Sequence, residues 1–96
     1  MVATTDVSGL RNAAAVAIQF VQALLADERV GDFRFEEFAE SADAQRWLIT
    51  VGFLRDEVKQ PVPWLTGIPM RVRDQKVVVI DKATGTPMAM RNRESD

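Results

Sequence analysis

The sequence predicts an α+β fold in which one N-terminal helix packs on a four-stranded antiparallel β-meander. Apolar residues recur with the 3.6-residue helical period before Gly31, and after it they alternate with polar residues, as in half-buried strands. Turn-forming residues separate the strand-like segments, and the connections look like hairpins rather than crossover helices. The predicted order is therefore α-β-β-β-β, with the helix covering the one apolar face of the sheet.

Length and composition fit a single domain over residues 1–96. The chain is 47% hydrophobic and 27% charged, which is ordinary for a soluble globular protein of this size. It contains no cysteine and no histidine, so it offers no disulfide, no thiol chemistry and no serine–histidine pair. We expect no enzymatic activity, no cofactor and no metal site.

The first residues predict a cytoplasmic protein. Asp6 precedes any basic residue, and Gln19 and Gln22 interrupt the apolar stretch, unlike a secretory signal. The longest nonpolar run, residues 13–18, has six residues, whereas a membrane-spanning helix needs about 20. Nine arginines against three lysines, with twelve alanines, indicate a bacterial source.

The helix is expected over residues 9–27. Seven apolar residues fall on one helical face, and Val16 and Phe20 widen that face. The seven are at positions 10, 14, 17, 18, 21, 24 and 25. A helix with so broad an apolar face is predicted to lie in the concave side of a sheet.

Four strands are expected, over residues 32–40, 46–54, 75–81 and 86–93. In the first, Phe38 is out of phase with Phe33 and Phe35, which predicts a bulge at residues 36–37. In the second, the strongest strand, Gly52 indicates a bend or a close backbone approach. Its opposite face is apolar and consists of Trp47, Ile49, Val51 and Phe53.

Residues 81–86 form a good hairpin connector, because Asp81 can cap the turn and Gly85 can adopt a positive φ. Met88 and Met90 are expected to share a strand face and to fill the core against the helix. Residues 56–70 hold three prolines and are expected to form a long ordered loop.

The segment VVVIDKATGTPMAM, residues 77–90, resembles the strand–D-x-x-T-G–strand hairpin of PepSY-type domains. The order of a helix followed by a meander resembles the cystatin-like topology, and the whole chain, with WLITVGF at residues 47–53, looks like small bacterial α+β proteins. PepSY domains have been linked to peptidase inhibition, and they are usually exported. The resemblance implies a fold class and no particular chemistry.

Charge divides unevenly along the chain. Residues 1–45 carry 3 basic and 8 acidic side chains, net −5, and residues 46–96 carry 9 and 6, net +3. The acidic stretch 27–43 could dock a basic partner or bind a hard cation such as Ca²⁺ or Mg²⁺. The favoured interpretation is a solvated strand face that discourages edge pairing. General-base candidates are confined to Glu36, Glu37, Glu40 and Asp81, and nothing in the pattern places them in an apolar pocket.

If Asp81 pairs with Thr86, Lys76 lies opposite Arg91. Two facing cations repel each other and could be retained to bind an anion or an acidic partner. Alternatively both side chains splay into water, or the register differs by one residue. Nucleic acid is not expected as a partner, because no aromatic residue interleaves with these cations.

The loop at 56–70 offers a second candidate surface. Pro63, Trp64 and Leu65 form a proline-stiffened aromatic segment, and tryptophan is enriched at binding hot spots. The alternative is that Trp64 and Leu65 plug one end of the core.

We therefore expect a small non-catalytic protein-interaction module, such as an adaptor, inhibitor or immunity-type protein, whose partner is another protein. It would present Pro63, Trp64 and Leu65, the cations Lys76 and Arg91, or an exposed sheet edge. The alternative is a small-ligand-binding domain with a pocket between helix and sheet. A homodimer through an edge strand is a third alternative, and no membrane association is expected.

Overall fold

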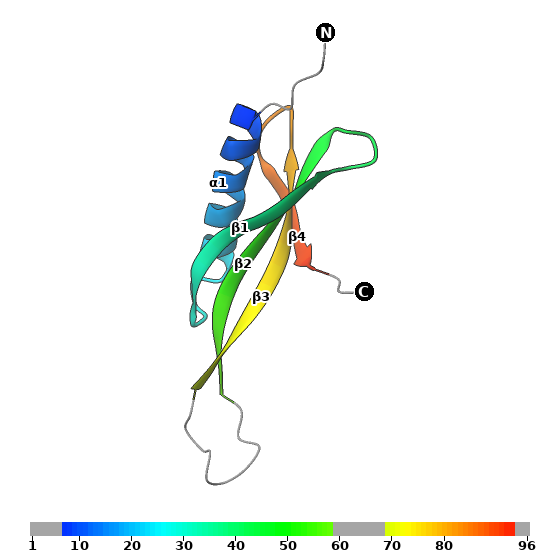
Figure 1. Ribbon diagram of the computed structural model, residues 1–96. Helices are drawn as coiled ribbons and strands as arrows, with labels where there is room; N and C mark the ends of the chain where they lie inside the picture. The colour runs from blue at the N-terminus through cyan, green and yellow to red at the C-terminus, as the bar shows by residue number, and fades with distance from the viewer. Residues whose placement is uncertain (1–6, 59–68, 94–96) are drawn as a thin grey trace.

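The computed structural model of the chain describes residues 7–58 and 69–93, and it confirms the predicted fold class. One helix is followed by four strands in a single antiparallel sheet of order β1-β2-β3-β4, and the helix lies along one face of that sheet (Figure 1). The elements are α1 (Val7–Leu24), β1 (Val30–Glu40), β2 (Arg46–Val58), β3 (Pro69–Asp81) and β4 (Pro87–Asn92).

The two central strands are longer than the hydrophobic alternation predicted. They pair without interruption from Arg46 opposite Asp81 to Val58 opposite Pro69. Backbone hydrogen bonds carry this ladder past the apolar positions, so residues 56–58 and 69–70, which were predicted to be part of a loop, belong to strands. Residues 59–68 lie outside the described residues, and they include Pro63, Trp64 and Leu65 of the predicted binding surface.

The core lies between α1 and one face of the sheet. Ala17 and Val21 of α1 are fully buried. The alternating residues of β2 that were predicted to share an apolar face are all buried there, with Val78 and Ile80 of β3 beside them. Burying each such side chain stabilises the fold by roughly 1.5–3 kcal/mol.

The opposite face of the sheet, called the open face below, carries the other residues of each strand. No described helix covers it. Residues paired across neighbouring strands lie side by side in rungs. The first rung is apolar: Ala39, Leu48, Val79 and Ala89. The second consists of Glu37, Thr50, Val77 and Arg91, and the third of Arg34, Gly52 and Gln75.

The first strand contains the predicted bulge. Phe35 pairs with Val51 and Glu37 pairs with Thr50, so Glu36 is the extra residue. A second irregularity separates Gly31 from Arg34, and Asp32 between them has a φ of 54°.

A third bulge, in β4, was not predicted. Ile80 pairs with Pro87 but Val79 pairs with Ala89, so Met88 is skipped. Met90 packs against the core, whereas Met88 is 50% exposed. The prediction that both methionines fill the core is therefore wrong for Met88, because the extra residue turns its side chain away.

Candidate functional site

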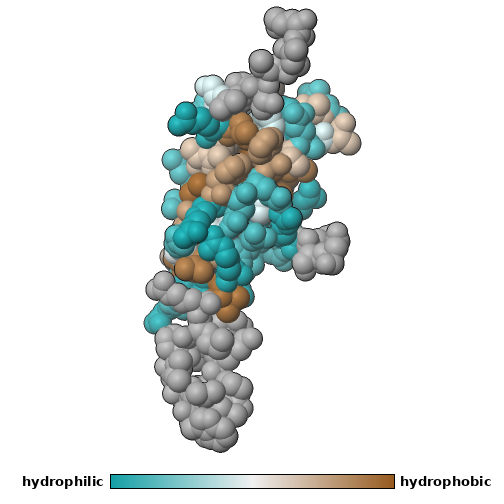
Figure 2. Space-filling model, in the orientation of Figure 1, coloured by the Kyte–Doolittle hydropathy of each residue, from teal (hydrophilic) through white to brown (hydrophobic). Residues whose placement is uncertain are grey.

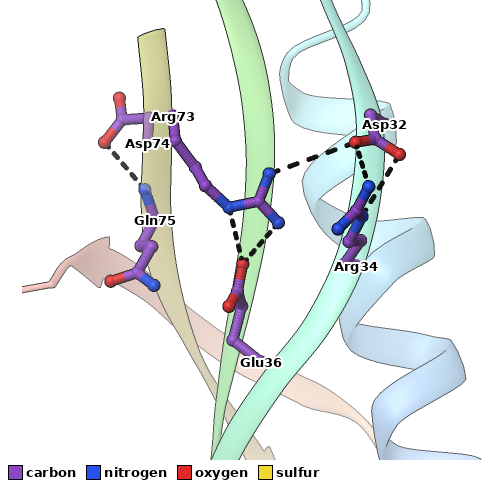
Figure 3. Close-up of polar contacts among 6 residues, drawn as sticks. All are labelled: Asp32, Arg34, Glu36, Arg73, Asp74 and Gln75. Atoms are coloured by element: carbon purple, nitrogen blue, oxygen red, sulfur yellow. Dashed lines mark hydrogen bonds and ion pairs between the residues drawn. The ribbon is translucent and has the colours of Figure 1, made fainter.

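An ion pair crosses the open face above Gly52. Arg73 of β3 donates from Nε and Nη2 to Glu36 Oε1 of β1, at 3.1 and 2.8 Å (Figure 3). These two side chains meet over β2, the strand between them. A Cβ on Gly52 would lie 1.9 Å from Glu36 Oε1, so only a glycine leaves room for the pair. The group that lies close to Gly52 is therefore the Glu36 side chain.

Asp32 extends this cluster along β1. Its Oδ2 lies 2.9 Å from Arg34 Nη2 and 4.0 Å from Arg73 Nη1 (Figure 3). One carboxylate therefore faces two guanidinium groups, and Arg73 is placed between the two carboxylates of Asp32 and Glu36.

A second cross-sheet contact covers Thr50. Arg93, directly after β4, donates from Nη1 to Thr50 Oγ1 at 3.3 Å and forms an ion pair with Glu37 of β1. Thr50 is only 4% exposed although it belongs to the open face. The arginine side chain, lying over the strands, explains this burial.

These contacts change the interpretation of the uneven charge. Every acidic side chain of β1 has a cationic partner, and most of these partners come from the second half of the chain. The pairs are Asp32–Arg34, Glu36–Arg73, Glu37–Arg93 and Glu40–Lys82. Three of these carboxylates, Glu36, Glu37 and Glu40, are therefore neutralised by cations of the basic half. Within residues 7–58 and 69–93, no three carboxylates gather closely enough to hold a metal ion.

The general-base candidates are engaged in the same way. Glu36, Glu37 and Glu40 are held in the ion pairs just described. Asp81 closes the β3–β4 turn as predicted: its Oδ1 accepts from the Ala83 N–H at 2.8 Å and its carbonyl from the Gly85 N–H at 2.7 Å.

A hollow of about 390 Å³, the Arg91 hollow, opens between the apolar rung and the ion pairs. Leu48 and Val77 are its half-buried apolar residues, while Arg91 and Arg93 lie on its β4 side. It is also lined by Glu37, Phe38, Ala39, Thr50 and Asn92. The side chain of Arg91 has no hydrogen bond or ion pair with another described residue, in contrast to Arg34, Arg73 and Arg93 of the same face.

The predicted pairing of Lys76 with Arg91 is wrong. Lys76 lies opposite Asn92, whose Oδ1 accepts a hydrogen bond from Lys76 Nζ, and Arg91 lies opposite Val77. Asp81 does pair with Thr86, as assumed, but the bulge at Met88 shifts the register beyond it by one residue. A one-residue shift moves a side chain to the other face, so Lys76 lies on the side of α1 and Arg91 on the open face.

The site also contains residues that the sequence analysis missed, chiefly Arg93 and the pair Leu48 and Val77. The signal available in the sequence was the alternation of the second strand, which puts Leu48 and Thr50 on the face opposite Trp47 and Ile49. Their neighbours on β3 and β4 could not be assigned without the bulge.

A second exposed feature follows the β1 edge. Phe35 and Phe38 are 41% and 44% exposed, and the Phe38 ring meets the buried Trp47 ring edge-on at 5.7 Å. Lys82 Nζ lies 4.2 Å from the centroid of the Trp47 ring. In Figure 2 apolar surface gathers over the upper part of α1 and β1, above a hydrophilic band.

Comparisons with protein-family models, with curated proteins and with solved structures found no match to this chain. The likeness to PepSY-type and cystatin-like proteins therefore extends to the α+β arrangement alone. No helix in the described ranges has the length and hydropathy needed to cross a membrane.

Proposed function

We propose that this chain is a small non-catalytic protein-interaction module, of the adaptor, inhibitor or immunity type, which binds its partner on the open face. The observation that carries the proposal is the Arg91 hollow, where half-buried apolar side chains lie beside an arginine without a described partner. Apolar contact combined with an available guanidinium is typical of protein interfaces, in which arginine is enriched.

The open face is favoured over the sheet edges. β1 is interrupted by two register shifts, and Asp32 between Gly31 and Arg34 has a positive φ. β4 has only six residues and begins with Pro87. Bulges, short strands and proline are the devices by which sheet edges avoid pairing with another strand. These features weigh against a homodimer formed through an edge strand.

A second candidate function is binding of a small ligand in the same hollow. Its volume of about 390 Å³ falls within the range of small-molecule sites. The interior between α1 and the sheet is occupied by fully buried side chains, including Ile49, Phe53 and Ile80, so a ligand site there is less well supported.

Affinity capture from a cell lysate at physiological salt tests the proposal. The baits are the wild-type chain, Ala89→Glu, which puts a carboxylate at an exposed position of the apolar rung, and the control Gln19→Glu on the exposed side of α1. We expect one specific protein to be retained by the wild type and the control and lost by Ala89→Glu. Retention by all three baits would exclude the open face, and retention by none would exclude the module.

The role of Trp64 is a separate prediction of the same proposal. A folded Trp64→Ala bait that loses the partner would place the proline-rich segment in the interface. If this bait retains the partner while Ala89→Glu loses it, the open face alone is sufficient.

A further inference from the structure

We infer that the segment recognised by the open face is an acidic peptide that also carries apolar side chains, with Arg91 as the residue that receives its carboxylate. This inference rests on the proposed function and names the chemistry of the partner. It follows from the charge of the Arg91 hollow and from the shape of the surface around it.

The charge of the hollow is unbalanced. Two arginines of its lining, Arg91 and Arg93, are two positions apart, and among the described lining residues Glu37 is the only one with a carboxylate. Arg93 already contacts Glu37 and Thr50, whereas Arg91 has no described partner. A carboxylate of a bound ligand would give Arg91 the partner that Arg93 already has in Glu37, because a guanidinium binds a carboxylate through two parallel hydrogen bonds.

An acidic ligand meets little opposition from the rest of the open face. The carboxylates nearest to the hollow are those of Glu36 and Glu37, and both are neutralised by arginines. A basic ligand, by contrast, would have to displace Arg73 or Arg93 from these pairs. Charge complementarity therefore selects an acidic occupant.

The surface is longer than a single small anion requires. A hollow of about 190 Å³ adjoins the Arg91 hollow through Glu37 and Arg93, and a third of about 410 Å³ continues it through Gln75 and Arg93. The apolar rung with Leu48 borders its other end. The smaller hollow also contains Glu36 and Glu37, which are paired with arginines, and the larger one contains Asp74, which is paired with Arg55. The apolar rung and the arginines follow one another along the strands, so this surface fits an extended peptide that lies along them.

Peptide titration followed by amide NMR shifts of the ¹⁵N-labelled chain tests the inference. The probe is a blocked pentapeptide of alternating leucine and glutamate, and its comparison peptide replaces glutamate with glutamine. The protein variants are Arg91→Gln and the control Arg11→Gln, which removes the same charge from the exposed side of α1. We expect saturable shifts at Leu48, Val77 and Arg91 with the acidic peptide. Arg91→Gln should weaken its binding roughly two- to fivefold, as for a part-exposed ion pair, and Arg11→Gln should not.

Equal binding of the glutamine peptide, or unchanged affinity in Arg91→Gln, would overturn the inference. Tighter binding of hexanoate or of a short single-stranded DNA than of the acidic peptide would overturn it as well, in favour of a small anion or a nucleic acid. If the capture experiment loses its partner with Ala89→Glu but the acidic peptide does not bind, the inference fails and the proposed function stands. If both experiments are negative, both fail.

Discussion

Replacing Gly52 with alanine probes the cross-sheet ion pair directly. The new Cβ would lie 1.9 Å from Oε1, 2.6 Å from Cδ and 2.8 Å from Cγ of Glu36. All three atoms belong to a flexible side chain, so Glu36 can swing away, but it then loses its hydrogen bonds to Arg73. The φ angle of Gly52 is not positive, so the alanine is compatible with the strand backbone.

The expected magnitude follows from two opposing effects. The side chains of Arg73 and Glu36 are 37% and 25% exposed, and a pair this accessible contributes about 0–1 kcal/mol. Alanine in a strand interior is favoured over glycine by roughly 0.5–1 kcal/mol. Gly52→Ala should therefore change the free energy of unfolding by less than about 1 kcal/mol. In a Glu36→Ala background, where the obstructing atoms are gone, it should stabilise by roughly 0.5–1 kcal/mol.

Urea denaturation followed by far-UV circular dichroism gives the four free energies of this double-mutant cycle. The ¹⁵N NMR signal of the Arg73 Nε–H group should also shift in Gly52→Ala, because its acceptor has moved. A loss of more than about 2 kcal/mol in both backgrounds, with no coupling between the sites, would refute the reasoning. It would mean that the glycine is required by the backbone and not by Glu36.

Three further predictions concern the turns and the core. Gly85→Ala, at a φ of +73°, should destabilise by roughly 1–2 kcal/mol in urea denaturation, while Gly31→Ala, with no atom within 4 Å of the new Cβ, should not. Hydrogen bonds from the Ser41 hydroxyl and then the Gln45 N–H lower the pKa of Asp43 below its ordinary 3.8. The hydrogen-bonded Asp43 carboxylate therefore stabilises the fold above pH 3.8, and this contribution is lost as the pH falls through the folded-state pKa of Asp43. An NMR titration should show that this pKa rises in Ser41→Ala. Ala17→Leu, at a fully buried position, should overpack the interface of α1 with the sheet and destabilise by roughly 1–3 kcal/mol, measured by thermal unfolding.

The local pattern of the sequence predicted the elements of this fold because each element carries its own signal. The period of 3.6 marks α1, the period of 2 marks β2, and the phase change at Phe38 locates the bulge at Glu36. Gly85 adopts the positive φ that its place in the turn required. Each of these predictions depends on residues within a few positions of one another.

The open face could not be predicted to the same extent, because it depends on the register between strands. The bulge at Met88 has no signature in the alternation of β4, and it alone moves Arg91 from opposite Lys76 to opposite Val77. The contact between Glu36 and Arg73, which are 37 residues apart, depends on how β1, β2 and β3 pair in the sheet. No pattern of neighbouring residues in the sequence indicates it. Because of the bulge, Arg91 lies on the open face, whereas Lys76 lies on the side of α1.

The pairing of charges on the open face limits which of its charged groups a partner can bind. In the sequence, residues 1–45 carry a net charge of −5 and residues 46–96 a net charge of +3. Such a division suggests charged surfaces that attract a partner of opposite charge. In the fold Glu36 and Glu37 pair across β2 with Arg73 and Arg93, and Asp32 pairs with Arg34 of its own strand. Charges that are paired at short range project little field beyond the surface. Unlike these three paired arginines, Arg91 on the same face has no ion pair with a described residue. Electrostatic recognition therefore depends on Arg91 and on how deeply an occupant of the hollow shields it from water.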